Sequence, residues 1–308
     1  MTIIMQSTHE DDLYAANAMD RALYELLHDS TTIRNIPGAF LDGGTINGTL
    51  SDTKTLRYAG LMGYDPMVTQ AAENTDVSTT ALEKAHVDLA VGRGSLRRDI
   101  TDMALMASGG AGPELLQLAA GMVGSFEKWF MDLTATAIQS ASQDVGSSGV
   151  NFSIDNFFEA TYELELDSVP GPYFMLLHPR QWADGRESLR GESGVLATDD
   201  AVSELLKLTG TGFKGQFLNV NVITSSRVAS SGGNRHGALW GFGALARVYG
   251  IPVQNGAVQY VAADGGAAPI LIEFDRDSSA ATTETVSHGY AGVAIAEQDR
   301  ICGVVTDE

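Results

Sequence analysis

Apolar side chains recur at helical spacing over residues 113–143, which predicts one long helix. Pro113 suits the first turn of a helix, and Glu114 lies where the helix dipole favours an acid. An unbroken helix of this length would measure about 46 Å, whereas a typical helix has about 12 residues. Its apolar stripe consists of Leu115, Leu118, Met122, Phe126, Trp129, Leu133 and Ala137.

The same spacing predicts shorter helices elsewhere in the chain. Residues Asp12 to His28 carry apolar side chains at helical intervals, with acidic residues at the start. Ser153 is placed to cap a helix that runs to about Leu166. Residues 199–208 form a further short helical pattern.

Between residues 55 and 101 the pattern changes to the alternation of β-strands. In "ALEKAHVDLAVGR", Ala85, Val87, Leu89 and Val91 alternate with polar side chains. This stretch and "TLRYAGLMGYDPM" are predicted to be the two arms of a long hairpin with a polar tip. A ribbon of two strands is marginally stable alone in water, so it needs another surface to lie on.

The rest of the chain mixes strands with short helices. The stretch "IPGAFLDGGTINGTLSDT" has the glycine, proline and aspartate density of an exposed arm. "PYFMLLHP" is predicted to be a buried strand, and "GQFLNVNVITSSRV" either a strand pair or one bent strand. The order is therefore arm, hairpin, long helix, mixed α/β segment and closing strands, which places the chain in the α+β class.

Composition adds constraints on partners and location. The 308 residues carry a net charge of −20, with five lysines and fourteen arginines. Such a surface repels free nucleic acid, so DNA would meet a local arginine cluster or be enclosed. The acidity also fits a surface charged for solubility, or a high-salt environment. The single cysteine, Cys302, excludes an intrachain disulfide. We find no signal segment and no membrane-spanning run, and we expect the chain to work in the cytoplasm or in something assembled there.

One stretch resembles a dinucleotide-binding fingerprint. Gly241-x-Gly243-x-x-Ala246 follows an apolar run, and Asp264 ends the next one. A crossover helix could run only over residues 244–249, and 44 residues after Asp264 are too few to complete a doubly wound sheet. We therefore favour an apolar strand whose glycines allow close packing, and we expect no cofactor.

Other catalytic arrangements are weak. Ser225, Ser226 and His236 lack the G-x-S-x-G turn of a serine hydrolase. No two histidines stand at the spacing of a helical metal site. We therefore expect no catalytic or metal-binding residues, and a protein that is not an enzyme.

A cluster of arginines stands out in this acidic chain. "VGRGSLRRDITD" contains Arg93, Arg97 and Arg98, followed by Asp99 and Asp102. The cluster could contact acidic groups of a neighbouring subunit or packaged nucleic acid. Equally, it could be a solvated hairpin base with local ion pairs, each worth about 0–1 kcal/mol.

The segments, taken in order, resemble the HK97-like coat fold of the major capsid proteins of tailed phages. "TLRYAGLMGYDPM" with "LEKAHVDLAVGRGSLRRDITDMALM" resembles the extended hairpin of that family, the E-loop. "PELLQLAAGMVGSFEKWFMDLTATAIQSAS" resembles its spine helix, and "FMLLHPRQWADG" its axial strand followed by a proline and a helix. "GFKGQFLNVNVITSSRVASSGGNRHGALWGFGALA" and "TVSHGYAGVAIAEQDRICGVV" resemble its later axial strands and its closing peripheral strands.

The resemblance implies five parts along the chain. They are an N-terminal arm (1–50), the E-loop hairpin (51–108), a peripheral domain with the spine helix (109–150), a mixed α/β axial domain (151–280) and return strands of the peripheral domain (281–308). It implies a subunit-interface set and a spine-helix core. The interface set is Arg57, Lys84, Arg93, Arg97, Arg98 and Asp99, and the core is Leu118, Met122, Phe126, Trp129 and Leu133.

The same resemblance implies the partners. A coat protein would assemble with itself as hexamers and pentamers around double-stranded DNA, in a virion built in the host cytoplasm and without a membrane. About 50 residues precede the hairpin, fewer than in relatives that carry their own scaffold, so we expect a separate scaffolding protein and a portal. Lys84 and Lys54 have no identifiable crosslinking acceptor. The alternatives are an encapsulin-type compartment shell and a nucleotide-dependent enzyme that uses Gly241 to Ala246.

Overall fold

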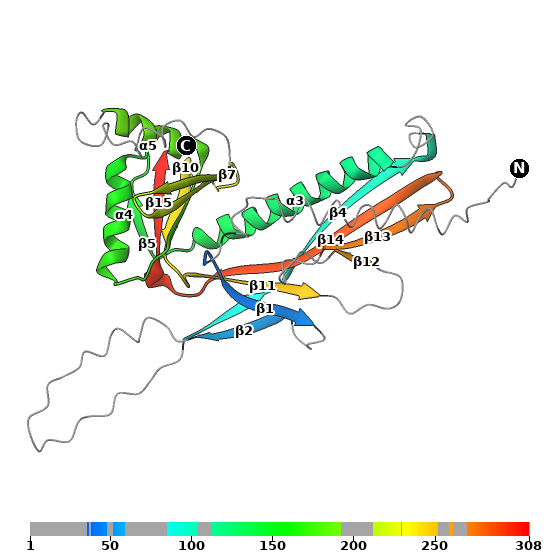
Figure 1. Cartoon of the computed structure of the whole chain (residues 1–308), viewed down its shortest axis with the longest axis horizontal. Helices are drawn as coiled ribbons and strands as arrows, with labels where there is room; N and C mark the ends of the chain where they lie inside the picture. The colour runs from blue at the N-terminus through cyan, green and yellow to red at the C-terminus, as the bar shows by residue number, and fades with distance from the viewer. Residues whose placement is uncertain are drawn as a thin grey trace, which may run out of the picture.

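The computed structural model describes residues 36, 38–47, 52–58, 85–103, 112–191, 212–228, 230–251, 259–261 and 270–307. In these ranges the strands form a six-stranded sheet, a seven-stranded sheet and a two-stranded ribbon. Figure 1 shows an elongated molecule in which the seven-stranded sheet lies at one end and the longest helix extends away from it along the six-stranded sheet. The predicted helices 12–28 and 199–208 lie outside the described residues.

The six-stranded sheet, here called the long sheet, is organised around one strand, β14 (Thr282–Ile295). β14 pairs antiparallel with three strands and is flanked by them along its whole length. The other members are β1 (Leu41–Asn47), β4 (Gly92–Thr101), β11 (Leu245–Ile251), β12 (Gln259–Val261) and β13 (Ile270–Asp277).

Helix α3 (Gly112–Ile138) packs on one face of the long sheet, where two glycines leave room for aromatic rings. Gly94 of β4 and Gly289 of β14 are directly paired across the strands. A Cβ atom at Gly289 would lie 2.7 Å from the ring of Phe126, and one at Gly94 would lie 2.8 Å from the ring of Trp129. Because these two positions have no side chain, the aromatic rings of α3 can pack directly on the backbone of the sheet.

The ribbon of β2 (Thr53–Tyr58) and β3 (Ala85–Ala90) packs on the opposite face of the long sheet. Its strands pair antiparallel, which confirms the two arms of the predicted hairpin. Leu89 is fully buried against Ala246 and Val248 of β11. The sheet thus supplies the surface that a thin ribbon requires. The connection between the two arms, residues 59–84, lies outside the described residues.

The seven-stranded sheet, here called the compact sheet, carries two helices. Its strands are β5 (Gln143–Gly146), β6 (Tyr173–Leu177), β7 (Gly212–Phe217), β8 (Val220–Thr224), β9 (Ser230–Ser231), β10 (Asn234–Trp240) and β15 (Ile301–Asp307). β7 and β8 form an antiparallel pair, so the strand-pair alternative is the correct one.

Both helices of the compact sheet begin where the sequence indicates. Ser153 caps α4 (Ile154–Leu166) in a capping box with Asn156, as predicted. α5 (Pro179–Gly191) begins at Pro179, directly after the buried strand β6. Ile154, Phe157, Ala160 and Leu164 are the buried side of α4, which packs on β5, β10 and β15.

Two local predictions need correction. The long helix ends at Ile138 rather than at residue 143, because residues 143–146 pair with β15. Part of the expected exposed arm is the strand β1, which pairs in parallel with β11. Ala39 and Phe40, just before it, are buried, and Trp240 Nε1 donates a hydrogen bond of 3.1 Å to the carbonyl oxygen of Ala39. The sequence pattern did not predict this strand, because its glycine and aspartate residues are typical of turns and loops.

The stretch "ALWGFGALARV" is not one strand but two. β10 lies in the compact sheet and β11 in the long sheet, and a turn joins them. Gly243 has a φ of 85°, and a Cβ atom at Gly241 would overlap Val169. The glycines therefore allow a tight turn and close packing. Residues 245–251, where a dinucleotide fold needs its helix, are a strand.

The sheets group the strands differently from the expected domain boundaries. β11, β12 and β13 were expected in an axial domain at 151–280, but they pair in the long sheet with β14. β5 and β15 were expected in peripheral segments, but they pair with each other in the compact sheet. These pairings join residues far apart in sequence, which local patterns do not specify.

Candidate assembly surfaces

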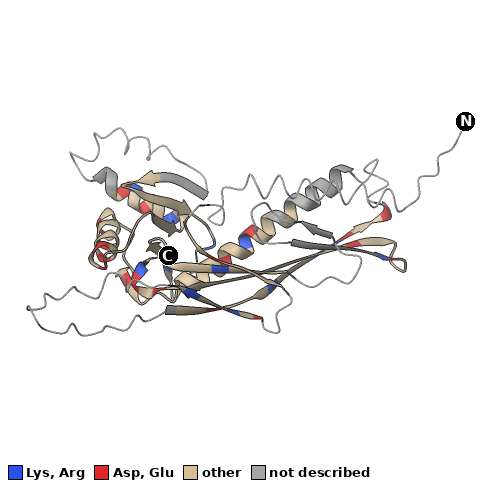
Figure 2. Cartoon of the chain, turned by 60° about the horizontal axis from the view of Figure 1, so that its bottom comes forward, with Lys and Arg blue, Asp and Glu red and all other residues tan. Residues whose placement is uncertain are grey.

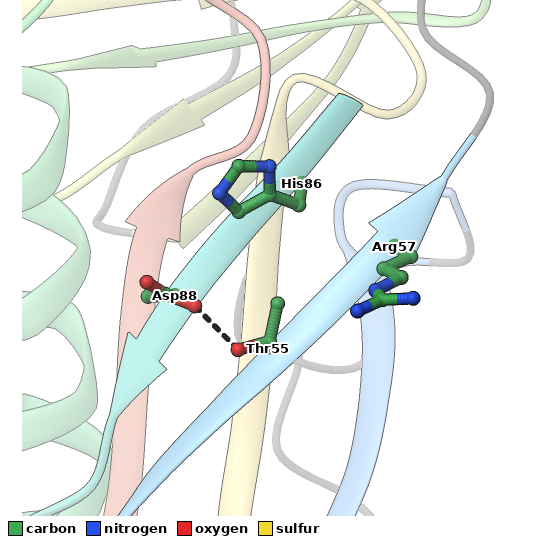
Figure 3. A pocket seen from close by; sticks show the side chains of 4 residues that line it. All are labelled: Thr55, Arg57, His86 and Asp88. Atoms are coloured by element: carbon green, nitrogen blue, oxygen red, sulfur yellow. Dashed lines mark hydrogen bonds between the residues drawn. The ribbon is translucent and has the colours of Figure 1, made fainter. Parts of the chain in front are cut away.

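The ribbon has an apolar face and a polar face. Leu56, Val87 and Leu89 face the long sheet, and the alternation of the strands turns Thr55, Arg57, His86 and Asp88 outward. These four polar side chains line a hollow of about 350 Å³ (Figure 3). Thr55 Oγ1 donates a hydrogen bond of 2.6 Å to Asp88 Oδ1. The hollow is open to solvent, and among its lining residues Arg57 carries a permanent positive charge.

Arg57 is exposed and has no hydrogen bond or ion pair within the described part of the chain. It lies opposite His86 across the two strands. A guanidinium in this setting can bind a carboxylate in a planar, bidentate geometry. The polar face of the ribbon is therefore suited to an acidic group from another molecule.

The predicted arginine cluster lies on β4 and is divided between the two faces of the long sheet. Gly94 faces α3, so Arg98 lies on the same face as the helix. Arg93, Arg97 and Asp99 lie on the other face, the side on which the ribbon packs. The sequence spacing brought these residues onto one strand but not onto one surface.

Arg97 forms ion pairs within the chain. Its Nε lies 3.0 Å from Asp99 Oδ1, and its Nη2 contacts Glu284 on β14. The hydrogen bond to Asp99 raises the pKa of Arg97. The side chain is 57% exposed, so solvent screens these pairs and their contribution to stability is small. Arg93 and Arg98 are exposed and have no such partner in the described residues.

A further ion pair closes the far end of β4. Arg276 donates two hydrogen bonds, of 2.9 and 2.7 Å, to the two oxygens of Asp102. The hydrogen bond from Arg276 lowers the pKa of Asp102. Asp102 appears in the sequence as part of the arginine cluster, but its partner is 174 residues away. Only the register of β13 against β14 could have indicated this pair.

The predicted spine-helix core lies largely under α3. Met122 and Phe126 are buried, and Trp129 and Leu133 are partly buried. Phe130, which the stripe omitted, is also buried, with its ring 6.2 Å from that of Tyr249. The side chain of Leu118 and all of Lys84 lie outside the described residues.

Within the described residues, the chain passes between the two sheets three times, at residues 139–142, 241–244 and 296–300. These connections lie side by side and are here called the junction. Gln298 accepts a hydrogen bond from the amide of Ser142 (3.0 Å) and donates one to the carbonyl of Ser140 (3.1 Å). The amide of Gly241 donates to the carbonyl of Arg300 (3.0 Å).

Arg300 is a buried residue that contacts two parts of the junction. Its side chain is 11% exposed, and its Nη1 donates a hydrogen bond of 2.8 Å to the carbonyl of Phe242. Its Nε lies 2.7 Å from Glu297. The amide of Ala296 donates to the carbonyl of Ala244 at 2.7 Å. Every connection is therefore hydrogen-bonded to the segment 296–300.

The described residues contain no group of histidine, cysteine, aspartate and glutamate side chains that could hold a metal ion. Among them we also find no helix with the length and apolar character needed to cross a membrane.

Comparison with known proteins identifies the fold. No protein-family model and no curated protein matches the sequence. Among solved structures, the capsid of Ralstonia phage GP4 is similar with a TM-score of 0.57 and 10% identity over 87% of each chain. The capsid of a native GTA particle is similar with a TM-score of 0.56 and 10% identity over 90% of each chain.

A third similar structure is the holo-SrpI encapsulin complex from Synechococcus elongatus, with a TM-score of 0.55 and 14% identity. The similarity extends over 86% of this chain and 84% of the encapsulin chain. The chain therefore has the fold of the subunits that build capsids and encapsulin shells. The HK97-like coat fold that the segment order indicated is confirmed, with α3 as the spine helix.

Proposed function

We propose that this chain is a major capsid protein that assembles into the icosahedral head of a tailed, double-stranded DNA virus. The observation that carries the proposal is the likeness to capsid subunits over most of both chains. A second support is the ribbon–sheet–helix body, on which the exposed Arg57, Arg93 and Arg98 have no partner among the described residues. The role is structural, so no catalytic residue is assigned.

The finer parts of the proposal follow from the same role. The subunits would form hexamers and pentamers with the help of a separate scaffolding protein and a portal, in the host cytoplasm. Arg57, Lys84, Arg93, Arg97, Arg98 and Asp99 would lie at contacts between subunits. DNA would be enclosed without specific recognition, because a chain with a net charge of −20 does not attract it over most of its surface.

An encapsulin-type shell is the second candidate, supported by the similarity to the encapsulin complex. The contents of the particle separate the two functions. A phage head would protect double-stranded DNA from nuclease, whereas a compartment would contain a cargo protein. The third alternative, a nucleotide-dependent enzyme, loses its basis because β11 occupies the place of the crossover helix.

The test is sedimentation velocity of the purified chain together with negative-stain electron microscopy, with and without a candidate scaffolding protein from the same source. We expect capsomers, tubes or closed shells. A chain that stays monomeric under all of these conditions would contradict the proposal. Closed shells with protein cargo and no nuclease-resistant DNA would favour the compartment instead.

A further inference from the structure

Helix α4 exposes a row of large apolar side chains. Phe158, Tyr162 and Leu166 are 44%, 59% and 63% exposed and stand four residues apart. This spacing aligns them along one side of the helix over about 12 Å. The opposite side of α4 is already buried on the compact sheet. An apolar row of this kind on a folded surface is typical of an interaction site.

The charged residues of α4 are all acidic. Asp155, Glu159, Glu163 and Glu165 lie on α4, and the helix contains no basic residue. None of these four carboxylates has an ion pair within the described residues. In Figure 2 the helix at the left edge correspondingly carries red and no blue. The partner surface must therefore combine apolar contact with positive charge.

The same α4 surface of another copy does not fit this requirement. A two-fold contact between two α4 helices would bring eight carboxylates together without a cation, since each helix contributes four. Repulsion of this kind costs several kcal/mol at an interface. The contact would have to be head-to-tail, between different surfaces of two molecules.

A matching surface exists on the chain itself, on the ribbon side of the long sheet. Arg57 and Arg93 are both exposed there, and neither has a partner within the described residues. Tyr290, paired with Arg93 across the strands and partly buried, adds an aromatic ring. In the chain α4 packs on β5, β10, β15 and α5, so its outer face is left for another molecule.

We infer that the α4 face docks on the Arg57–Arg93 surface of a second copy of this chain. The inference rests on the proposed function and names the contact through which neighbouring subunits associate. Glu159 or Glu163 would pair with one of the two arginines, and the apolar row would contact the ribbon side of the long sheet beside Tyr290. A head-to-tail contact repeats in the same sense from copy to copy, so it can close into a ring.

The test places the photoreactive residue benzoylphenylalanine at position 162 of the full chain. After irradiation we expect covalent dimers and larger multimers, with links to residues 53–58 or 92–101 of another copy. Links to residues 154–166 of the other copy would overturn the head-to-tail arrangement. Associated chains that give no link from position 162 would overturn this inference alone. Chains that stay monomeric would overturn both it and the proposed function, whereas links within dimers that form no capsomer, tube or shell would support this contact and contradict the proposed function.

A charge swap provides the second measurement. Glu159→Lys is expected to weaken association about 10-fold or more, the effect of about 1.4 kcal/mol. The matched control is Glu187→Lys, which changes an exposed carboxylate of α5 by the same charge and should leave association unchanged. Arg57→Glu combined with Arg93→Glu should restore association of the Glu159→Lys chain. Equal effects of the two lysine variants, or no restoration, would contradict the contact.

Discussion

Replacing Gly289 with alanine would place a methyl group into the contact between α3 and the long sheet. The added Cβ would lie 2.7 Å from two atoms of the Phe126 ring, closer than real Cβ contacts allow. Phe126 is buried, with 8% of the residue exposed, so its ring cannot move into solvent freely. Either the helix lifts or the strand bends.

The magnitude can be worked from two opposing effects. Overpacking of a core contact costs about 1–3 kcal/mol. Removing a glycine from a strand recovers about 0.5–1 kcal/mol of backbone entropy. The expected net loss for Gly289→Ala therefore lies between about 0 and 2.5 kcal/mol in the free energy of unfolding, with a central value of about 1 kcal/mol. Gly94→Ala should cost less, because Trp129 is partly exposed and its ring can tilt toward solvent.

The assay is urea unfolding of the unassembled chain, followed by circular dichroism, for both variants and for Phe126→Leu. Loss of the ring leaves space above Gly289, so Gly289→Ala should be neutral or stabilising in that background. The coupling between the two sites should reach about 1–2 kcal/mol. A raised urea midpoint for Gly289→Ala alone, or strictly additive effects of the two substitutions, would refute the conclusion that contact with the Phe126 ring requires glycine at position 289.

Three further predictions follow from other contacts. Arg97→Glu with Arg98→Glu should leave the subunit folded by circular dichroism but block shell formation in the electron microscope, since both side chains are exposed; normal particles would remove these arginines from the interface. Burial raises the pKa of the Cys302 thiol to about 12, so the buried thiol stays protonated and should resist a thiol reagent at pH 8 until urea is added; fast reaction of the folded chain would contradict this burial. The pKa in the unfolded chain is 9.0, so between pH 9.0 and 12 the unfolded chain loses the thiol proton first, and the free energy of unfolding should fall as the pH rises. Gly243→Ala should lower the urea midpoint, because a Cβ at a φ of 85° is strained and would lie 2.8 Å from Arg300 Nη1, and an unchanged midpoint would refute the strain.

Local patterns in the sequence predicted the elements that are built from consecutive residues. The alternation around Val87 and Leu89 specified the ribbon, and Ser153 specified the start of α4, because each signal lies within a few residues of its effect. The order of the segments also indicated the fold as a whole.

Contacts between distant residues were not predictable in this way. Residues 244–249 could form a helix or a strand by local pattern, and it is pairing with β14 that makes them a strand. The strand β1 depends likewise on β11. The acidic and apolar surface of α4 was not predictable, because the sequence alone does not show which apolar residues of the helix are buried and which are exposed.

The junction has a mechanical consequence. A force that pulls the two sheets apart is divided among three covalent stretches, and Gln298 and Arg300 bond these stretches to one another. A protease nick in one stretch would leave two intact, so the halves would stay attached. One buried cluster also joins the two halves, because it includes Phe174 and Trp240 of the compact sheet and Tyr249 of the long sheet. A nicked subunit should therefore keep both its attachment and its packed core.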